Sequence, residues 1–469
     1  MTESKSSTSL KKRFLFGLSA FPDQLTYQAF TILVFTFYFA VVGIDIMLMM
    51  FAFIIWGIWN AINDPLLGAL SERTKQKGKL GKRKFYLIIS VVPLSLMMIF
   101  LFTAPGQDLM VNFFYFLVII LVFELFYTMF DVNVNAIFPE MFPTEKERAS
   151  TNMFLKGLTL IAVIIASIVP TLIIHPLVPL TKSPSEVARI KSMYITAGIV
   201  LAVITGALSI PFILFAIDEK EEMAAQFEKR PGFFESLKFT LKNKTFVKFV
   251  IANTMVWYCF TILLTVFPLY AVFVLGIEEE SFLIGIILMV ALLASALFIP
   301  LQKKIGTKFG MRNGLILGLI IWIITLFPLV LLSKGDALIA IIIFGCIGYG
   351  LSSALFYVDI IHADVIDQDA LKFGVKRSAS YYGINAFIHR ISSILSIVTI
   401  ALVFSGTGWS SYTPVTNNPE LTVIGLKLLM FVFPAIALII AILFFLSFEL
   451  HGENLKKMRE ELAKHPELK

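Results

Sequence analysis

The number and length of the apolar stretches constrain the fold of this chain most strongly. A helix needs roughly 20 apolar residues to cross the hydrocarbon core of a bilayer. Twelve stretches are of about this length: 14–43, 45–71, 84–104, 110–138, 148–175, 193–217, 246–273, 281–302, 313–333, 337–361, 378–405 and 422–448. Short segments of alternating polarity, which mark a membrane barrel, are absent from the sequence. The sequence therefore predicts an all-α membrane protein with twelve transmembrane helices.

The composition agrees with a lipid environment. Hydrophobic residues make up 58% of the 469 residues, and charged residues only 15%. A soluble domain carries about 45–50% apolar and about 25% charged residues. The chain has too little polar surface to cover a water-soluble shell, so lipid is the expected solvent for most of it.

The net charge is +7, and the basic residues behind it are unevenly distributed among the loops. Basic residues crowd the N-terminus, the 73–84 loop and the 218–245 interval, whereas the loops expected on the opposite side hold only Lys182, Arg189, Lys191 and Lys334. Cytoplasmic loops carry such an excess. We therefore expect a multi-pass protein of the plasma membrane with both termini in the cytoplasm. The surplus of basic residues sets the orientation of the chain in the membrane and attracts anionic lipid headgroups. Nucleic-acid binding is not expected.

The chain divides into two similar halves. We expect six helices in 1–217, a cytoplasmic middle loop at 218–245, six helices in 246–448 and a cytoplasmic tail at 449–469. Within the loop, Phe233, Leu237 and Leu241 recur every four residues, as in an interfacial helix, although a solvated linker fits equally well. A Gly-rich basic turn follows the second span of each half. This pattern resembles the major facilitator fold of two pseudo-symmetric six-helix halves.

Ionisable residues inside the spans are candidate functional groups. Burying one costs about 2.5–3.5 kcal/mol on insertion scales. The candidates toward the middle of the predicted spans are Asp23, Asp64, Glu124, Asp131, Lys156, His389 and Arg390. A further acidic group, Asp359, Asp364, Asp367 and Asp369, lies at the end of the tenth span, where we expect a solvated loop.

Spans 2 and 4 carry the pattern of a cation site. Asn60 and Asp64 share one helical face, with Asn63 beside them, and Glu124 and Thr128 do the same on span 4. Carboxylate and carbonyl oxygens suit a hard cation such as Na⁺, and a buried carboxylate also carries a proton. In the alternative, residues 63–65 simply end a helix near the cytoplasm.

Polar residues of spans 1, 4 and 5 form the candidate substrate site. On span 4 and span 5, Asp131 and Lys156 offer opposite charges to a polar ligand, and a purely structural ion pair is the alternative. The other members are Asn135 on span 4 and Asp23, Gln24 and Tyr27 on span 1.

His389 and Arg390 in span 11 point about 100° apart on a helix, so one of them is expected to face the interior. A histidine there suits proton transfer, and an arginine suits pairing with a carboxylate.

Several of these residues belong to segments that resemble a known transporter family. The run 59–68, the segments 71–74 and 81–84, Tyr127 to Asp131, and Ser378 to Arg390 closely resemble the glycoside-pentoside-hexuronide:cation symporters, the family of melibiose permease. The resemblance implies cation-coupled symport of a sugar or glycoside by alternating access. It also implies a monomer with no cofactor other than coupling Na⁺ or H⁺. Lysolipid transporters are distant relatives.

The resemblance assigns roles to particular positions. The coupling cation falls at Asn60, Asn63, Asp64 and Thr128, and Asn60 replaces the usual aspartate, which favours proton coupling or a weaker cation site. Glu124 would restore the missing charge. The sugar-binding positions fall at Asp131, Lys156, Asn135 and Gln24 beside Asp23, and the family's span-11 lysine falls at His389 or Arg390.

Two other functions compete with sugar symport as interpretations of these residues. A lysolipid or other amphiphile is the second candidate substrate, because Asn135 replaces an aromatic platform. An intramembrane prenyltransferase is a remote alternative suggested by Asn63-Asp64. Its chemistry needs a second aspartate one turn on, where this chain has Leu67 and Gly68. We therefore expect a transporter and not an enzyme.

Overall fold

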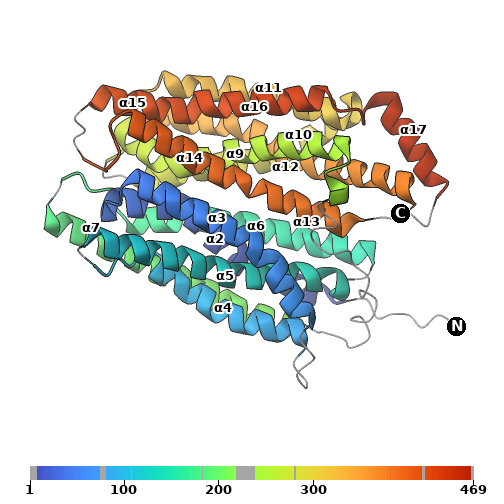
Figure 1. The fold of residues 1–469 in the computed structure, drawn as a ribbon, viewed down its shortest axis with the longest axis horizontal. Coiled ribbons are helices and arrows are strands. Elements are labelled where there is room, and N and C mark those ends of the chain that lie inside the picture. Colours follow the sequence, from blue (N-terminus) through green and yellow to red (C-terminus); the bar gives the residue numbers. More distant parts are fainter. Residues whose placement is uncertain are drawn as a thin grey trace. The chain divides into compact units, whose positions relative to one another are not determined.

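The computed structural model describes the chain apart from residues 1–7, 74–80, 107, 143, 182, 218–237, 279–280, 375–376, 415–417 and 466–469. Every regular element in the described part is helical (Figure 1). The chain forms two compact units, the first made of Met1–Lys229, Glu278–Gly285 and Ser411–Val415, the second of Arg230–Ile277, Ile286–Ser410 and Thr416–Lys469.

The first unit contains six membrane-length helices. The first span, Leu10–Val42, changes geometry repeatedly, from α1 (Leu10–Gly17) through π-helical η1 (Phe21–Leu25), α2 (Thr26–Ala29), η2 (Phe30–Val34) and η3 (Phe37–Val42). The others are α3 (Ile46–Arg73), α4 (Lys82–Phe100), α5 (Leu109–Met141), α6 (Glu145–Ile173) and α7 (Pro184–Pro211) with η4 (Phe212–Ala216). Helix α5 packs on α3 and α4, and α1 packs on α6.

The second unit has a similar set. Its spans are α9 (Lys244–Phe273), α10 (Phe282–Phe309), α11 (Met311–Leu326) with η6 (Phe327–Val330), α12 (Ala337–Phe373), α13 (Ser378–His389) with α14 (Ile391–Gly406), and α15 (Pro419–Lys427) with η7 (Leu428–Val432) and α16 (Phe433–Leu446). A short helix, α17 (Gly452–Ala463), follows. Helix α9 packs on α14 and α16.

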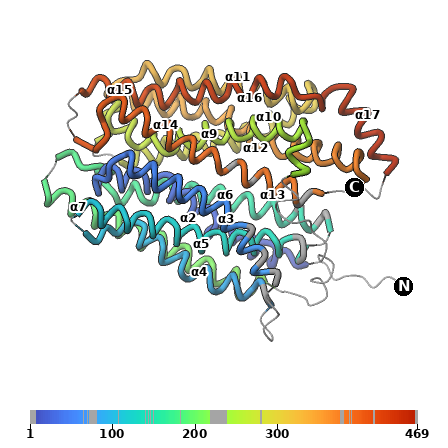
Figure 2. Tube along the Cα trace, in the orientation of Figure 1, coloured from blue at the N-terminus to red at the C-terminus, as the bar shows by residue number. Residues whose placement is uncertain are grey.

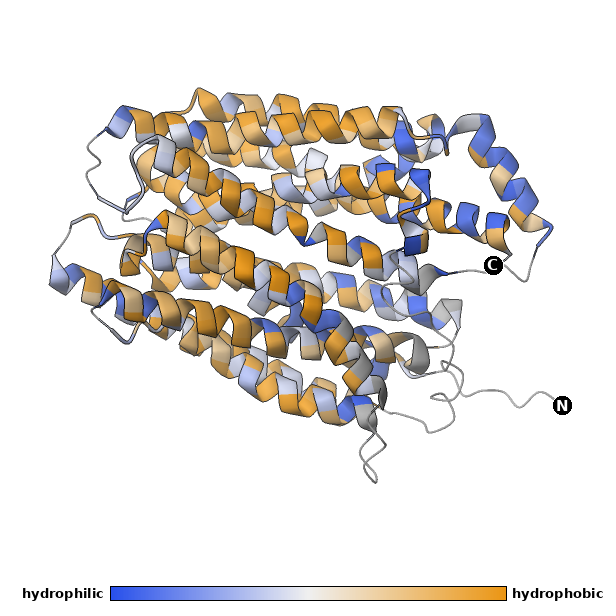
Figure 3. Ribbon diagram, viewed as in Figure 1, coloured by the Kyte–Doolittle hydropathy of each residue, from blue (hydrophilic) through white to orange (hydrophobic). Residues whose placement is uncertain are grey.

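Burial and hydropathy fit a membrane protein. The most apolar windows of Leu10–Val42 and Lys244–Phe273 are 83% and 78% buried, so each unit is built around its first span. The outer helices expose large hydrophobic side chains, for example Leu297, which is 79% exposed. Hydrophobic residues run along the long helices, and hydrophilic ones gather near helix ends and along α17 (Figure 3). Lipid, and not water, suits this surface.

Side-chain caps fix where several helices begin. Asp108 accepts hydrogen bonds from the main-chain N–H groups of Met110 and Val111 at the start of α5. At the start of α6, Thr144 and Glu147 form a reciprocal capping box. These contacts satisfy donors that a helix leaves free in its first turn.

The twelve-span prediction is confirmed, with two differences in detail. Eleven helices in the described part of the chain are long and apolar enough to cross a membrane, and the remaining predicted span, 378–405, corresponds to α13 and α14, which meet at Arg390. Figure 2 shows α13 and α14 in succession along the chain. Helix α12 continues to Phe373, twelve residues beyond the predicted end, so the expectation of a solvated acidic loop is wrong. Most of the predicted middle loop, 218–237, lies outside the described residues.

Candidate functional site

A buried carboxylate lies at the centre of the first unit. Glu124 has no exposed surface and projects from the middle of α5. The indole Nε1–H of Trp56, on α3, donates to Glu124 Oε2 at 3.0 Å. The hydroxyl of Thr128, one turn along α5, donates to Glu124 Oε1 at 3.2 Å. Both carboxylate oxygens are therefore held by named donors, as a buried acid requires.

The asparagines of α3 lie against the same part of α5. Asn63, fully buried, donates from Nδ2 to the main-chain oxygen of Glu124 at 3.2 Å, and Trp59 donates to the main-chain oxygen of Leu121 at 3.1 Å. Among the described residues, no donor lies within hydrogen-bond distance of Asn63 Oδ1. A buried amide oxygen that can still accept a hydrogen bond or coordinate an ion is a suitable ligand for a small cation or a water.

Helix α3 runs unbroken through this region. It continues past Asp64 to Arg73, so the alternative that residues 63–65 end a helix is wrong. Asn60 is buried and Asp64 half-buried, on the face shared at a spacing of four residues. The structure thus brings both Asn63 and Thr128 into contact with Glu124, and Asn60 and Asp64 lie on the same helix as Asn63.

A second acidic site lies on the first span. Asp23 belongs to η1, directly after Pro22, where the helix widens into a π-turn. Tyr127 of α5 donates its hydroxyl to Asp23 Oδ1 at 2.8 Å, and Gln24 donates from Nε2 to Asp23 Oδ2 at 3.0 Å. The charge of Lys156 also acts on Asp23. Widened turns of this kind are frequent at functional positions.

The other predicted substrate residues surround this site. The ring of Tyr27 stacks on that of Tyr127, with centroids 5.1 Å apart. Asn135 donates from Nδ2 to Asp131 Oδ1 at 2.7 Å, and the charge of Asp131 acts on Tyr127. Asn135 and Lys156 are exposed. Tyr27, Asp23 and Asp131 are thus grouped around one tyrosine ring.

Sequence reasoning missed two residues of these sites. Trp56 and Tyr127 each donate a hydrogen bond to a predicted acidic group, yet neither was among the candidate site residues. A signal for Tyr127 exists, because it precedes Asp131 by four residues and shares its helical face. Trp56 gave no such signal, since its partner lies on another helix.

The span-11 candidates belong to the second unit. Helix α13 ends at His389 and α14 begins at Ile391, so Arg390 forms the junction. The side chain of His389 lies outside the described part of the structure, and Arg390 is half-buried. The α13 and α14 region is also joined to α9 through polar pairs, Asn253 to Asn385 and Tyr258 to Thr399, each at 3.0 Å.

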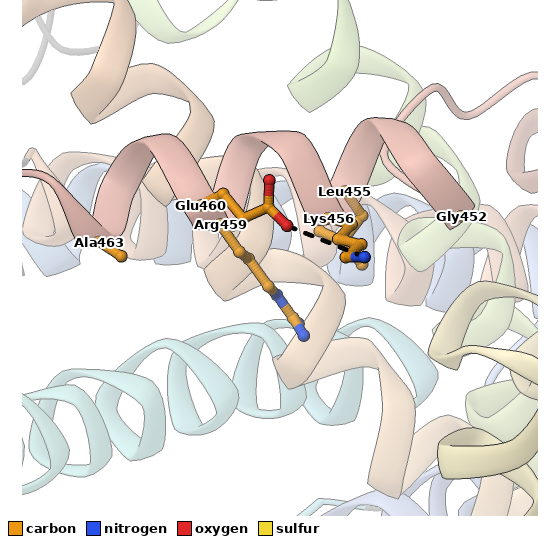
Figure 4. A pocket seen from close by; sticks show the side chains of 6 residues that line it. All are labelled: Gly452, Leu455, Lys456, Arg459, Glu460 and Ala463. Atoms are coloured by element: carbon orange, nitrogen blue, oxygen red, sulfur yellow. Dashed lines mark ion pairs between the residues drawn. The ribbon is translucent and has the colours of Figure 1, made fainter.

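A surface pocket of the second unit is distinct from these sites. About 380 Å³ in volume, it follows one face of α17 and is lined by Gly452, Leu455, Lys456, Arg459, Glu460 and Ala463 (Figure 4). Arg459 pairs with Asp364 of α12 at 2.8 Å, and Lys456 pairs with Glu460 at 3.9 Å. None of the candidate site residues lines this pocket, which belongs to the packing of the C-terminal helix.

Twelve spans in two units, with buried acidic groups inside the spans, define a multi-pass membrane transporter. Residues 15–452 match the family model described as MFS/sugar transport protein. The chain therefore belongs to this family. Its members and its structural neighbours are transporters, so the protein is a secondary transporter of the major facilitator type and not an enzyme. The prenyltransferase alternative is thereby excluded.

Named relatives carry different substrates. A putative sulfoquinovose importer of Salmonella typhimurium is 23% identical over 460 residues, covering 97% of this chain and 93% of that protein. The sodium-dependent lysophosphatidylcholine symporter 1 of Xenopus tropicalis is 21% identical, covering 86% of this chain and 80% of that protein. The solved structure of the nucleoside transporter NupG covers 94% of this chain and 100% of its own, with a TM-score of 0.66 at 14% identity, which indicates the shared fold.

Proposed function

We propose that this protein is a cation-coupled symporter of the glycoside-pentoside-hexuronide type that moves a sugar or glycoside across the plasma membrane. The observation that carries the proposal is the pairing of two acidic sites in one unit. Glu124, held by Trp56 and Thr128, serves the coupling ion, and Asp23, held by Tyr127 and Gln24, serves the substrate. Both termini face the cytoplasm, and the coupling ion is Na⁺ or H⁺.

The ion site uses oxygen atoms from two adjacent helices. Asn60, Asn63 and Asp64 supply amide and carboxylate oxygens from α3, and Glu124 and Thr128 supply them from α5. Glu124 takes over the charge that Asn60 does not provide. Ion binding neutralises a buried charge, and this favours the loaded carrier over the empty one.

The substrate site uses polar side chains that are open to a ligand. Asp131 with Asn135, and Asp23 with Gln24, present carboxylate and amide groups to sugar hydroxyls, and Lys156 balances their charge. Tyr27 and Tyr127 add stacked rings beside these groups. His389 and Arg390 are the span-11 candidates for the same role. Alternating access, with halves at 1–217 and 246–448 joined by 218–245, exposes the substrate to each side in turn.

A lysolipid is the second candidate substrate. A lysophosphatidylcholine symporter aligns with 86% of this chain, and Asn135 stands where the sugar carriers of the family have an aromatic platform. A lipid carrier binds long acyl chains competitively, whereas a sugar carrier ignores them.

Uptake into proteoliposomes tests the proposal. Labelled glycosides, pentosides, hexuronides and sulfoquinovose are offered under an imposed Na⁺ or H⁺ gradient, beside lysophosphatidylcholine. Accumulation of a sugar under one gradient supports the proposal and identifies the ion. Movement of the lysolipid alone would replace the sugar with an amphiphile and keep the transporter class.

A further inference from the structure

Four buried aromatic rings join the two acidic sites of the first unit. The ring centroids of Trp56 and Phe30 are 5.5 Å apart at 28°, those of Phe30 and Phe123 are 4.9 Å apart at 3°, and those of Phe123 and Tyr127 are 5.9 Å apart at 17°. The stack begins at the indole that donates to Glu124 and ends at the phenol that donates to Asp23. We name these four residues the aromatic bridge.

The bridge crosses three separate helices. Trp56 lies on α3, Phe30 begins the π-helical η2 of the first span, and Phe123 and Tyr127 lie on α5. All four rings are buried, with 3%, 5%, 0% and 8% of their surfaces exposed in the order of the stack. Close-packed interiors leave few voids, so a displaced ring displaces its neighbour.

We propose that the aromatic bridge couples the ion site to the substrate site, so that a change at the Glu124 carboxylate alters the hydrogen bond between Tyr127 and Asp23. Trp56 and Tyr127 are the positioning residues at its two ends, and Phe30 is the link between helices. This inference rests on the proposed function, in which Glu124 serves the ion and Asp23 the substrate.

At the Glu124 end of the aromatic bridge, a change in the charge of the carboxylate changes its hydrogen bond with Trp56. An indole N–H is a donor only, so Trp56 bonds most strongly to Glu124 Oε2 when the carboxylate is ionised. Charge-assisted hydrogen bonds are about twice as strong as neutral ones. A proton or a cation on Glu124 therefore weakens the hydrogen bond that Trp56 donates to Glu124. The hydroxyl of Thr128 both donates and accepts, so it tolerates a protonated or an ionised Glu124.

A competing route has to be separated from the bridge. Phe123, Glu124 and Tyr127 lie on one helix, so α5 itself connects the two sites. Phe30 does not lie on α5, yet its ring stands between those of Trp56 and Phe123. Substitution at Phe30 therefore interrupts the bridge and leaves α5 unchanged. Coupling between two sites needs such a direct test, since spatial intermediacy alone does not establish it.

The experiment follows the two ends of the bridge without any substrate. The full-length protein in detergent carries fluorotryptophan at position 56 and fluorotyrosine at position 127, and ¹⁹F NMR records both signals during titrations with NaCl and with acid. In the wild type we expect both signals to shift with one shared midpoint. In Glu124→Gln neither signal shifts.

The decisive variant is Phe30→Leu, with Phe30→Met as a second choice if leucine prevents folding. We expect the Trp56 signal still to respond and the Tyr127 response to be lost. Phe102→Leu is the control, because Phe102 is fully buried in the same unit and its ring contacts are with Phe37 and Tyr194, outside the bridge. This control keeps both responses.

Two results would overturn the inference. If the Tyr127 response persists in both Phe30 variants, α5 carries the coupling. If Trp56 shifts in the wild type and Tyr127 does not, the two sites are not coupled through these rings. Failure of the proposed function appears elsewhere, either as no shift at Trp56 with either ion or as no uptake of any sugar.

Discussion

At the residue scale, the site depends on two acidic groups, the buried Glu124 and the half-buried Asp23, each held by one partner on its own helix and one on another helix. Glu124 is held by Trp56 and Thr128, and Asp23 by Tyr127 and Gln24. A buried charge without partners costs several kcal/mol, so these hydrogen bonds are conditions for placing acids inside the spans. The acids then become the groups whose loss changes function most.

The first prediction concerns the charge of Glu124. Glu124→Gln keeps the size of the side chain and removes its negative charge; its amide oxygen accepts from Trp56 and its amide nitrogen donates to the hydroxyl of Thr128. We expect uptake to lose its dependence on the ion gradient as completely as in Asp64→Asn. Asp108→Asn is the matched control, because asparagine caps the exposed start of α5 as well as aspartate does. Ion-dependent uptake by Glu124→Gln at the wild-type level would contradict the assignment.

The second prediction concerns pH and Glu147, which lies outside the spans at the start of α6. Burial raises the pKa of Glu147, but hydrogen bonds from Thr8 and Thr144 outweigh it and bring this pKa below its ordinary value. A lowered pKa contributes stability above the unfolded value of about 4.3, and the contribution is lost as the pH falls. We expect Glu147→Gln to lower Tm at pH 7 and to match the wild type only when the pH lies below the lowered folded-state pKa. A Tm difference that persists in acid would contradict this.

At the element scale, helix length and breaks depend on partners that are distant in sequence. Helix α12 extends through its acidic end because Asp364 pairs with Arg459 at 2.8 Å and Asp369 with Arg377 at 2.6 Å. The guanidinium of Arg377 also lies 4.5 Å from the ring centroid of Phe373. Such pairs allow carboxylates to remain in a helix that the sequence alone indicated as loop.

The third prediction tests the docking of α17 on α12. Arg459→Ala removes the partner of Asp364, a residue only 7% exposed, so we expect α17 to detach from α12 more readily. The measure is the rate of limited proteolysis after the last transmembrane helix, which should rise. Lys456→Ala is the control, because its pair with Glu460 is exposed and contributes little. Equal cleavage rates for the two variants would show that the ion pair does not hold the helix.

The fourth prediction concerns the close packing of α4 and α7. A Cβ at Gly198 would meet the main-chain oxygen of Met98 and approach the Phe102 ring at 3.2 Å. We expect Gly198→Ala to destabilise the protein by about 1–3 kcal/mol, the usual range for overpacking. Gly157→Ala, with no atom within 4 Å of the added Cβ, serves as control and should leave Tm unchanged or raise it. A neutral Gly198→Ala would mean that the two helices separate easily.

At the scale of the whole molecule, much of the architecture could be predicted because lipid imposes a simple rule on span length. Every predicted span corresponds to a helix or, at 378–405, to a broken pair. The break at Arg390 could not be predicted, because Ile388 to Ile391 contains neither proline nor glycine.

Spacing along the sequence predicted the pairs that share a helix, and the family resemblance grouped spans 2 and 4, whose Asn63 and Glu124 do lie in contact. Glu124 with Thr128 follows from a spacing of four residues. The bonds from Trp56 to Glu124 and from Tyr127 to Asp23 join different helices, and periodicity within one helix does not reveal them. The substrate itself depends on the shape of the site, which a single sequence does not encode in any local pattern.

The central claim is that an ion gradient drives a polar substrate through this protein by way of a buried acid. The most direct measurement is uptake of labelled sugars into proteoliposomes under a Na⁺ or H⁺ gradient, with wild type and Asp64→Asn compared side by side. We predict that one sugar accumulates under one gradient and that Asp64→Asn abolishes the accumulation. Accumulation by Asp64→Asn that equals the wild type, or uptake that does not respond to either gradient, would contradict the account.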